Sequence, residues 1–315
     1  MKDIRVVSIG DLVTDYYYLN GNIVGVSGGM SSHNIIANLC FMGKSALTFG
    51  VSGNDLSGNI AIKSLKDIGV DISYIKVLNN IDTKSVHISY GNNKIYSEIH
   101  CPFCNNKKWY DNSLIDFNYV IDNIKENDVL VFDNLNEVNQ KIIDSTNNIK
   151  FIDLGHIRDF RELSMNEFKE RINNKFKIIN INNSVYDYLI DKFKLENIND
   201  IYELFGTDLI IITEGKKGAK FIFDGKVYNL KLNNIIKEVD VTGAGDAFFS
   251  SIINDVIDNN FGVDDTKFDD WFSSATKLTS RVVTKMGARG HIHDLYKIKE
   301  CDNCCLCDKF ILEEK

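Results

Sequence analysis

The fold is decided by residues 240–248, which read Asp-Val-Thr-Gly-Ala-Gly-Asp-Ala-Phe. An apolar run follows, so we expect a loop that turns into a helix over 245–260. The first N–H groups of such a helix point at one spot, where the helix dipole adds positive charge. Gly243 and Gly245 carry no side chain and let an anion approach the backbone. Asp246 would lie beside that anion, placed to take a proton from an attacking hydroxyl.

The whole string, rather than its two glycines, carries the functional interpretation. A glycine-rich turn with a following acid also occurs at ordinary helix starts. Asp-x-Thr-Gly-Ala-Gly-Asp-Ala-Phe, however, resembles the C-terminal signature of the ribokinase-like (PfkB) carbohydrate kinases, and every specified position is matched. The resemblance implies that Asp246 is the catalytic base and that the amides of Gly243, Ala244 and Gly245 form the anion hole. It implies ATP and magnesium as cofactors and admits a monovalent cation.

The N-terminal part extends the resemblance. Residues 4–10 read as a buried strand ending in glycine, and two acids follow at its carboxyl edge, where ligands of α/β sheets bind. A Gly-Gly pair and an Asn then precede an apolar helical run, as in the family's sugar-binding signature. Four residues separate the Gly-Gly pair from the Asn in this chain, whereas three separate them in the family. The predicted substrate contacts are Asp11, Asp15, Gly28, Gly29 and Asn34.

A third segment, residues 210–219, resembles the family's strand and turn beside the nucleotide phosphates. A strand ending in Thr-x-Gly leaves a hydroxyl and amides free for phosphate oxygens, although a plain glycine hairpin is the alternative. Asp153 with Arg158 resembles the family's Asp-x-Asn-x-Arg segment, with looser spacing. The predicted nucleotide contacts are Asn182, Thr213, Gly215 and Gly218.

One departure from the family concerns magnesium. The family has Asn-x-x-Glu after the strand at 177–181, and its Glu helps to order the metal and its waters. If Asn182 takes the Asn place, Val185 takes the Glu place. Valine cannot bind metal, so the sequence predicts either other oxygen ligands, with Asp187 nearby, or reduced activity.

Strand-like and helix-like segments alternate along the chain, which favours a mainly parallel sheet covered by helices on both faces. The resemblance implies the same ribokinase-like α/β fold, as a single kinase domain over 1–315. Two segments, 15–27 and 84–100, instead alternate apolar and polar residues. We expect them to form a small antiparallel lid, which in this family covers the sugar and often forms a dimer contact. The predicted strands are 4–10, 45–51, 128–132, 149–153, 177–181 and 208–213, with a hairpin at 219–230. The predicted helices are 31–43, 57–69, 113–126, 137–147, 164–173, 184–192, 198–206, 245–260 and 267–286.

Composition excludes several classes of function. The net charge is −8 and no basic stripe is present, which argues against nucleic acid as a partner. No run approaches the length of a membrane span, and the chain enters its first strand without a signal peptide. We therefore expect a cytoplasmic protein whose partner is a small-molecule sugar or nucleoside, with a homodimer through the lid as an option.

Six of the seven cysteines fall into two clusters, over 101–104 and over a Cys-rich tail at 301–307. Two Cys-x-x-Cys pairs can satisfy a tetrahedral structural zinc site. Free thiols and a redox role remain alternatives, and the resemblance is silent because the family lacks such clusters. The candidate zinc ligands are Cys101, Cys104, Cys301, Cys304 and Cys307.

The substrate stays open at this stage. The carbohydrate kinase resemblance implies phosphorylation of a sugar hydroxyl. Asn34 and Asn38, one helical turn apart, also resemble the helix start of pseudouridine kinases, so a nucleoside is the alternative. A sugar- or nucleotide-binding sensor that lost efficient transfer is a third hypothesis, motivated by Val185 and opposed by the intact Asp246.

Overall fold

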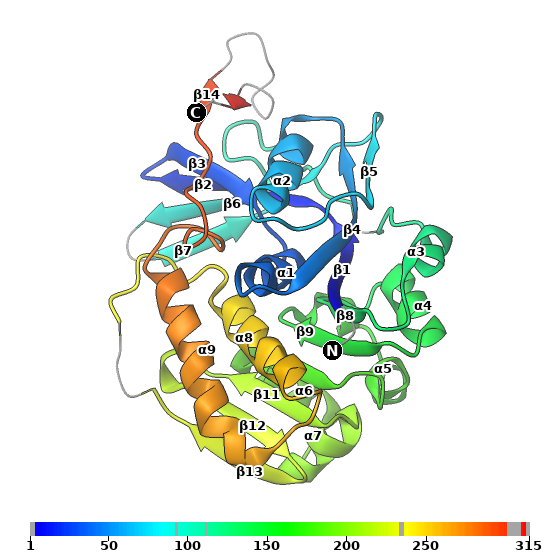
Figure 1. Ribbon diagram of the computed structural model, residues 1–315. Coiled ribbons are helices and arrows are strands. Elements are labelled where there is room, and N and C mark those ends of the chain that lie inside the picture. The colour runs from blue at the N-terminus through cyan, green and yellow to red at the C-terminus, as the bar shows by residue number, and fades with distance from the viewer. Residues whose placement is uncertain (1–3, 92–93, 111, 233–235, 301–309, 313–315) are drawn as a thin grey trace.

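The computed structural model describes residues 4–91, 94–110, 112–232, 236–300 and 310–312. A nine-stranded sheet runs through the molecule, with a separate four-stranded sheet at one end of its strands (Figure 1). At the C-terminal end, β14 (Ile298–Glu300) pairs with β15 (Phe310–Leu312).

The large sheet has the strand order β13-β12-β11-β10-β9-β8-β1-β4-β5. All neighbours pair in parallel except β12, which runs antiparallel to both of its neighbours. The mainly parallel sheet expected from the sequence is therefore confirmed. Its strands are β1 (Arg5–Asp11), β4 (Ser45–Gly53), β5 (Ile75–Leu78), β8 (Val129–Phe132), β9 (Ile149–Leu154), β10 (Ile178–Asn182), β11 (Leu209–Thr213), β12 (Ala219–Phe223) and β13 (Lys226–Leu230).

Helices cover both faces of this sheet, and two separate apolar clusters lie between the layers. One face carries α1 (Ser31–Phe41), α2 (Leu56–Lys66), α8 (Ala244–Asp258) and α9 (Phe268–Val283). The other carries α3 (Phe117–Asn123), α4 (Glu137–Ser145), α5 (Met165–Ile172), α6 (Asn183–Phe193) and α7 (Ile198–Phe205). None of the described helices could cross a membrane.

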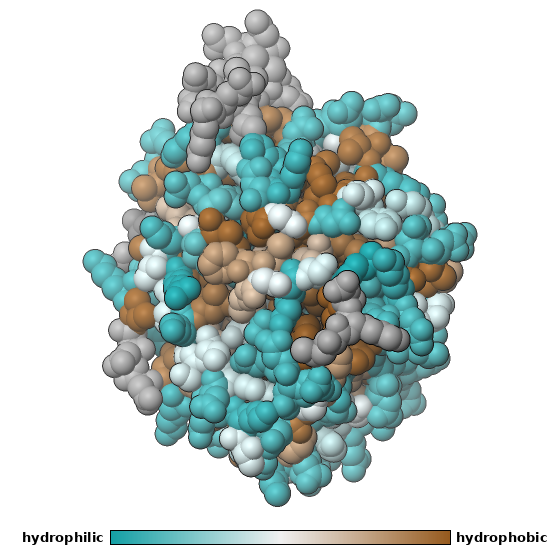
Figure 2. Space-filling view, in the orientation of Figure 1, coloured by the Kyte–Doolittle hydropathy of each residue, from teal (hydrophilic) through white to brown (hydrophobic). Residues whose placement is uncertain are grey.

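The strand β11 shows why both faces need helices. Leu209 and Ile211 belong to the apolar cluster under α8, whereas Ile210 and Ile212 belong to the opposite cluster. Side chains alternate between the two faces of a strand, so an uninterrupted apolar run needs cover on both sides. The helices have hydrophilic outer surfaces, which cover most of the lower half of the face shown in Figure 2.

The small sheet is the predicted lid, with strand order β3-β2-β6-β7. Its first segment forms two strands, β2 (Val13–Leu19) and β3 (Asn22–Gly28), and its second forms β6 (Lys84–Gly91) and β7 (Lys94–Glu98). Each pair is antiparallel, and the two pairs are joined by a parallel β2–β6 pairing.

The topology places the site. After β1 the chain adds β4 and β5 on one side, and it then returns to place β8 on the other side of β1. Ligands of open α/β sheets bind outside the carboxyl ends of the strands at such a reversal. The lid begins directly after β1, so it lies over this edge.

Candidate active site

A cavity of about 1120 Å³ lies between the lid, the carboxyl ends of the central strands and the N-terminus of α8. Seven of the predicted residues line it, and they come from the lid, from α1, from the ends of β10 and β11 and from the start of α8: Asp15, Asn34, Asn182, Thr213, Gly243, Gly245 and Asp246. Residues more than 200 positions apart in the sequence thus share one cavity. Asp11 and the cysteines are not among the residues that line it.

The N-terminus of α8 is held open by its own loop. Gly243 is the N-cap residue with φ 78°, and no side chain caps the helix. A Cβ on Gly243 would lie 2.6 Å from the Ala288 side chain, so only glycine fits. Asp240 fixes the loop by accepting hydrogen bonds from the amides of Thr242 (2.9 Å) and Gly287 (2.7 Å). The loop is therefore preformed, and no side chain caps the helix, although the Ala244 amide donates to the Val241 carbonyl at 3.1 Å.

Asp246 occupies the first turn of α8 and is 7% exposed. Its Oδ2 accepts a hydrogen bond from Asn34 Nδ2 at 2.8 Å. Burial raises the pKa of Asp246 to about 6, while hydrogen bonds from Asn34 and Ser31 oppose that rise and the charge of Asp133 adds to it. The carboxylate is thus a stronger base than an exposed aspartate and still ionises near neutral pH.

Two further carboxylates line the cavity at the ends of β8 and β9. Asp153 accepts a hydrogen bond from Asn180 Nδ2 at 2.7 Å, and Asp133 accepts one from the Ser32 amide at 2.8 Å. Burial raises the pKa of both, and the charge of Asp246 raises that of Asp153 further. A cation bound near Asp246, Asp133 and Asp153 would favour the ionised form of these buried carboxyl groups.

Asp15 lies in β2 of the lid and faces the same cavity. Burial raises its pKa to about 7, and the charge of Arg289 and a 3.2 Å hydrogen bond from the Tyr17 hydroxyl oppose that rise. A buried carboxyl group that lines the cavity can accept hydrogen bonds from substrate hydroxyls.

Asp11 has a different place. Its carboxylate pairs with the ammonium of Lys84 at 3.1 Å and accepts a hydrogen bond from the Leu114 amide at 3.1 Å. These contacts join the end of β1 to the lid strand β6. The substrate contact of Asp11 stays a prediction, and the Asp11 carboxylate contacts other residues of the protein.

Gly28 and Gly29 have neighbours that explain why they are glycines. A Cβ on Gly28 would lie 2.4 Å from Arg289 Nη1, and one on Gly29 would lie 2.3 Å from Asp15 Oδ1. Both distances are shorter than any real Cβ contact, so the pair makes room for two charged groups.

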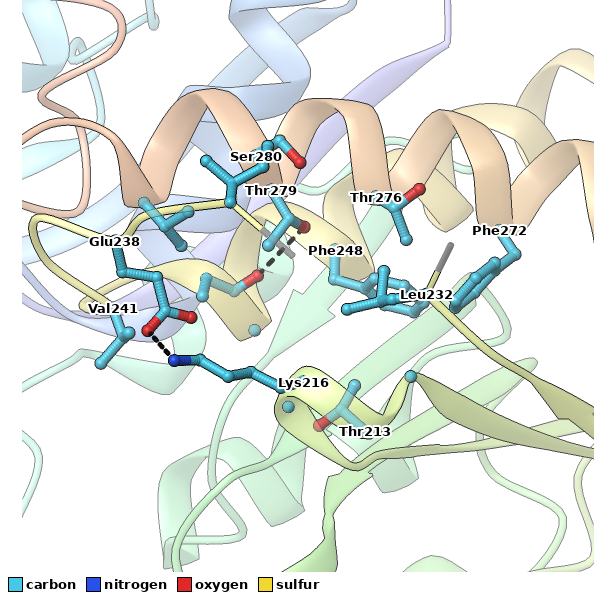
Figure 3. Close-up of a pocket in the computed structure, with 16 residues that line it drawn as sticks. Thr213, Lys216, Leu232, Glu238, Val241, Phe248, Phe272, Thr276, Thr279 and Ser280 are labelled. Atoms are coloured by element: carbon cyan, nitrogen blue, oxygen red, sulfur yellow. Dashed lines mark hydrogen bonds and ion pairs between the residues drawn. The ribbon is translucent and has the colours of Figure 1, made fainter. Parts of the chain in front are cut away.

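A second pocket, of about 200 Å³, adjoins the cavity and shares Thr213, Val241 and Gly245 with it. Helix α9 supplies one wall and β11 with its following turn supplies the other (Figure 3). An ion pair of 2.8 Å between Lys216 and Glu238 crosses one side. The predicted nucleotide residues Thr213, Gly215 and Gly218 all line this pocket, and most of its other residues are apolar.

The start of α6 shows where Asn182, Val185 and Asp187 lie. Asn182 ends β10, lines the large cavity and caps α6 by accepting a hydrogen bond from the Val185 amide at 2.9 Å. Val185 is 1% exposed and belongs to the apolar core. Asp187 is exposed, bonds to Asn183 and is not among the residues that line the cavity. If Asn182 takes the family's Asn place, as the resemblance implies, the Glu place holds a core valine.

The cysteines give no metal site within the described part of the chain. Cys101 is buried and sits in a tight turn in which the Asn105 amide donates to its carbonyl at 2.9 Å. Cys301, Cys304 and Cys307 lie outside the described residues. Among the residues that are described, no group of three or more His, Cys, Asp or Glu side chains could hold a metal ion. The shared zinc ion stays a prediction.

Comparison with known proteins identifies the class. The family model described as pfkB family carbohydrate kinase matches residues 5–294, and the chain belongs to this family. A ribokinase from Dictyostelium discoideum is 24% identical over 299 residues, covering 86% of this chain and 88% of that protein.

Solved structures of the same fold include two kinases with bound ligands. Aminoimidazole riboside kinase from Salmonella enterica, with aminoimidazole riboside and an ATP analog, has a TM-score of 0.69 and 19% identity, covering 92% of this chain and 96% of that one. Fructokinase from Vibrio cholerae, with fructose, ADP and calcium, has a TM-score of 0.70 and 17% identity, covering 91% and 94%. Both likenesses show the fold.

Sequence reasoning missed three residues of the site. Asp133 follows a buried strand, a position that could have indicated it, since ligands bind at carboxyl ends of strands. Asn180 was hidden inside the strand β10. Arg289 had no signal, because an arginine between Ala288 and Gly290, after the last predicted helix, reads as a surface residue.

Proposed function

We propose that the protein is an ATP-dependent phosphotransferase that moves the γ-phosphoryl group of ATP to a hydroxyl of a sugar. One observation carries this proposal: Asp246, at the uncapped N-terminus of α8, lines the same cavity as Asp15. An acceptor hydroxyl that lies between Asp15 and Asp246 is adjacent to the base, and the helix amides lie next to it.

Two adjoining pockets support a site for the nucleotide. Apolar side chains of the smaller pocket, such as Leu232, Phe248 and Phe272, suit a planar base. Thr213 and Gly245 line both pockets, so the phosphates would pass from the smaller pocket into the cavity at these residues. The γ-phosphoryl group would then lie at the amides of Gly243, Ala244 and Gly245. Asp246 would then accept the proton of the acceptor hydroxyl as the hydroxyl oxygen bonds to the γ-phosphorus, while the bond from that phosphorus to the bridging oxygen breaks and ADP leaves.

Oxygen atoms in the cavity fit magnesium despite Val185. Asp153 supplies a carboxylate, and Asn180 Oδ1 is a buried oxygen with no hydrogen-bond partner in the described part of the chain. Magnesium keeps several waters and needs only one or two carboxylates beside the phosphates. These two residues would hold the ion, which when bound neutralises charge on the transferring phosphoryl group. A monovalent cation stays a prediction.

A nucleoside is the second candidate substrate, and the lid favours it. Apolar side chains line the lid end of the cavity, where a free sugar would present hydroxyls. The relevant residues are Val13, Val86, Ile88, Ile99 and Trp109. A planar base attached to the sugar would cover this wall, and the riboside bound to the Salmonella kinase is a molecule of that shape.

A substrate panel tests the proposal. Sugars and nucleosides are supplied with ATP and magnesium, and ADP release is measured for the wild-type protein and for Asp246→Asn. The proposal requires at least one acceptor that stimulates ADP release in the wild type and far less in the variant. Equal ADP release in both proteins would contradict the role of Asp246. Stimulation by nucleosides but not by free sugars would select the second candidate.

A further inference from the structure

Arg289 is the largest of the fully buried side chains, at 1% exposure. It lies after α9, and all three of its guanidinium nitrogens donate hydrogen bonds. Nε donates to Asn34 Oδ1 (2.9 Å), Nη1 to Ser64 Oγ (2.8 Å) and Nη2 to the Gly29 carbonyl (3.0 Å). A planar fork with three partners on three segments has one orientation only.

Asn34 links Arg289 to the acid in the cavity. Its side-chain oxygen accepts from Arg289, and its Nδ2 donates to Asp246 Oδ2 at 2.8 Å. The amide has an acceptor end and a donor end, and a guanidinium can only donate. Arg289 therefore holds the oxygen toward itself and turns the NH₂ group toward the carboxylate. A reversed amide would place its oxygen against Asp246 and its NH₂ against Arg289, which costs both hydrogen bonds.

The glycine pair shows that the chain is built around this arginine. Gly28 lacks the Cβ that would strike Arg289 Nη1, and Gly29 lacks the Cβ that would strike Asp15. The charge of Arg289 also compensates that of Asp15, whose pKa it lowers against the effect of burial. One buried cation thus supports two acids that line the cavity.

We propose that Arg289 is a positioning residue for phosphoryl transfer, which acts through Asn34 to orient the carboxylate of Asp246 toward the acceptor hydroxyl. This inference rests on the proposed role of Asp246 as the base. It predicts that the wild-type kcat needs the hydrogen bonds of the Arg289 guanidinium, and that a positive charge alone at this position does not maintain it.

Arg289→Met tests the proposal, with Arg5→Met as the matched control. Arg5 makes a two-bond contact with Asp128 at the amino end of β1, away from the cavity. Misplacement of a reacting group by about 1 Å can cost on the order of 10²-fold in rate. We expect a loss in kcat of that order for Arg289→Met with an unchanged KM for ATP. Arg5→Met should lose thermal stability and keep its kcat.

The pH profile separates positioning from a merely structural role. Without Arg289 the Asn34 amide is free to turn, so Asp246 loses a donor and the acid limb of kcat should move to higher pH. Arg5→Met should keep the wild-type limb. Other charged groups near Asp246 are common to both variants: Asp15, Asp133, Asp153 and His156.

Arg289→Lys and a double-mutant cycle complete the experiment. Lysine keeps a buried charge without the fork, so Arg289→Lys should fold and remain slow. In an Asn34→Leu background, Arg289→Met should have little additional effect on kcat. The proposal is overturned if Arg289→Lys has the kcat and acid limb of the wild type. It is also overturned if the losses of kcat in Asn34→Leu and Arg289→Met multiply in full in the double variant. Asp246→Asn is measured in the same assay. If Asp246→Asn stays active, the proposed function is wrong. If Asp246→Asn is inactive and Arg289→Lys has the wild-type kcat, only the positioning role of Arg289 is wrong.

Discussion

Helices α8 and α6 begin at the same cavity, and their first turns differ in a way that separates binding from structure. At α8 the N-cap is Gly243, no side chain caps the helix, and the third residue is Asp246. At α6 the N-cap is Asn182, whose side chain accepts from the amide of the third residue, Val185. One helix begins without a side-chain cap beside an acid, whereas the other is capped by a side chain and buries an apolar residue in its first turn.

This difference supports the proposed place of the transferring phosphoryl group. Unsatisfied N–H groups at a helix start bind an anion, and a capping side chain takes that place when no ligand is needed. The family resemblance implies a metal-ordering Glu at the third position of α6, where this sequence has Val185. In this chain, the charged chemistry lies at α8, β8 and β9 instead, with Asp246, Asp133 and Asp153.

Asp246→Asn should have the largest effect. Removal of a general base costs on the order of 10²–10⁴-fold in rate, and the amide keeps the shape of the carboxylate. We expect kcat to fall in that range while the Kd for ATP, measured by calorimetry, stays near the wild-type value. The matched change at α6 is Val185→Thr, which buries a hydroxyl without a planned partner and costs about 1–3 kcal/mol of stability. A loss of kcat in Val185→Thr as large as that in Asp246→Asn would remove the contrast between the helices.

Gly243→Ala and Gly245→Ala should differ strongly from each other. Gly243 has φ 78° and a Cβ there would strike Ala288, whereas a Cβ on Gly245 meets no atom within 4 Å. Alanine in the left-handed region costs about 1–3 kcal/mol, so Gly243→Ala should lower the melting temperature and displace the amides. Gly245→Ala should keep its stability and weaken only nucleotide binding. Thermal unfolding measures the stability of both variants, and equal losses would show that the loop does not require glycine at position 243.

The pH dependence of kcat should follow Asp246. Burial raises its pKa to about 6 in the folded protein, and a base must be ionised to accept a proton. Activity should therefore be full above that value and fall about tenfold for each pH unit below it. A rate that stays constant down to pH 4 would show that ionised Asp246 is not required.

Asn182→Ala should have the smallest effect. It removes the cap of α6 and a hydrogen bond to the Gly155 carbonyl at 2.9 Å. Loss of an N-cap costs about 1 kcal/mol, so the melting temperature should fall by a few degrees, with kcat little changed. A large loss of kcat with normal stability would mean that Asn182 contacts the nucleotide, as the family resemblance implies.

The sequence predicted the parts of the molecule whose signal is local. The strand at 208–213 was clear because its apolar run is buried on both faces, and the observed β11 is Leu209–Thr213. The strand β5 was missed because its four residues are partly or fully exposed at the sheet edge. The helix predicted over 113–126 is confined to Phe117–Asn123, since Asp116 caps its start and the preceding residues contact Asp11 instead.

The candidate site was predictable where a motif supplied its residues and unpredictable where only tertiary contact does. Gly243 and Asp246 belong to one string with a physical reason for each residue. Arg289 acquires its meaning only when the C-terminal segment meets Asn34, which lies 255 positions earlier in the chain. Likewise, Gly28 and Gly29 were interpreted as substrate contacts, and only the structure shows the charged groups for which they leave space.

The central claim is that the N-terminus of α8 receives the phosphoryl group beside Asp246. The most direct test is a crystal structure with magnesium, ADP, an acceptor from the panel and aluminium fluoride, which mimics a phosphoryl group in transfer. The account predicts the fluoride group within hydrogen-bond distance of the amides at Gly243, Ala244 and Gly245, with the acceptor hydroxyl between it and Asp246. A fluoride group bound at the start of α6, or an acceptor hydroxyl out of reach of Asp246, would contradict it.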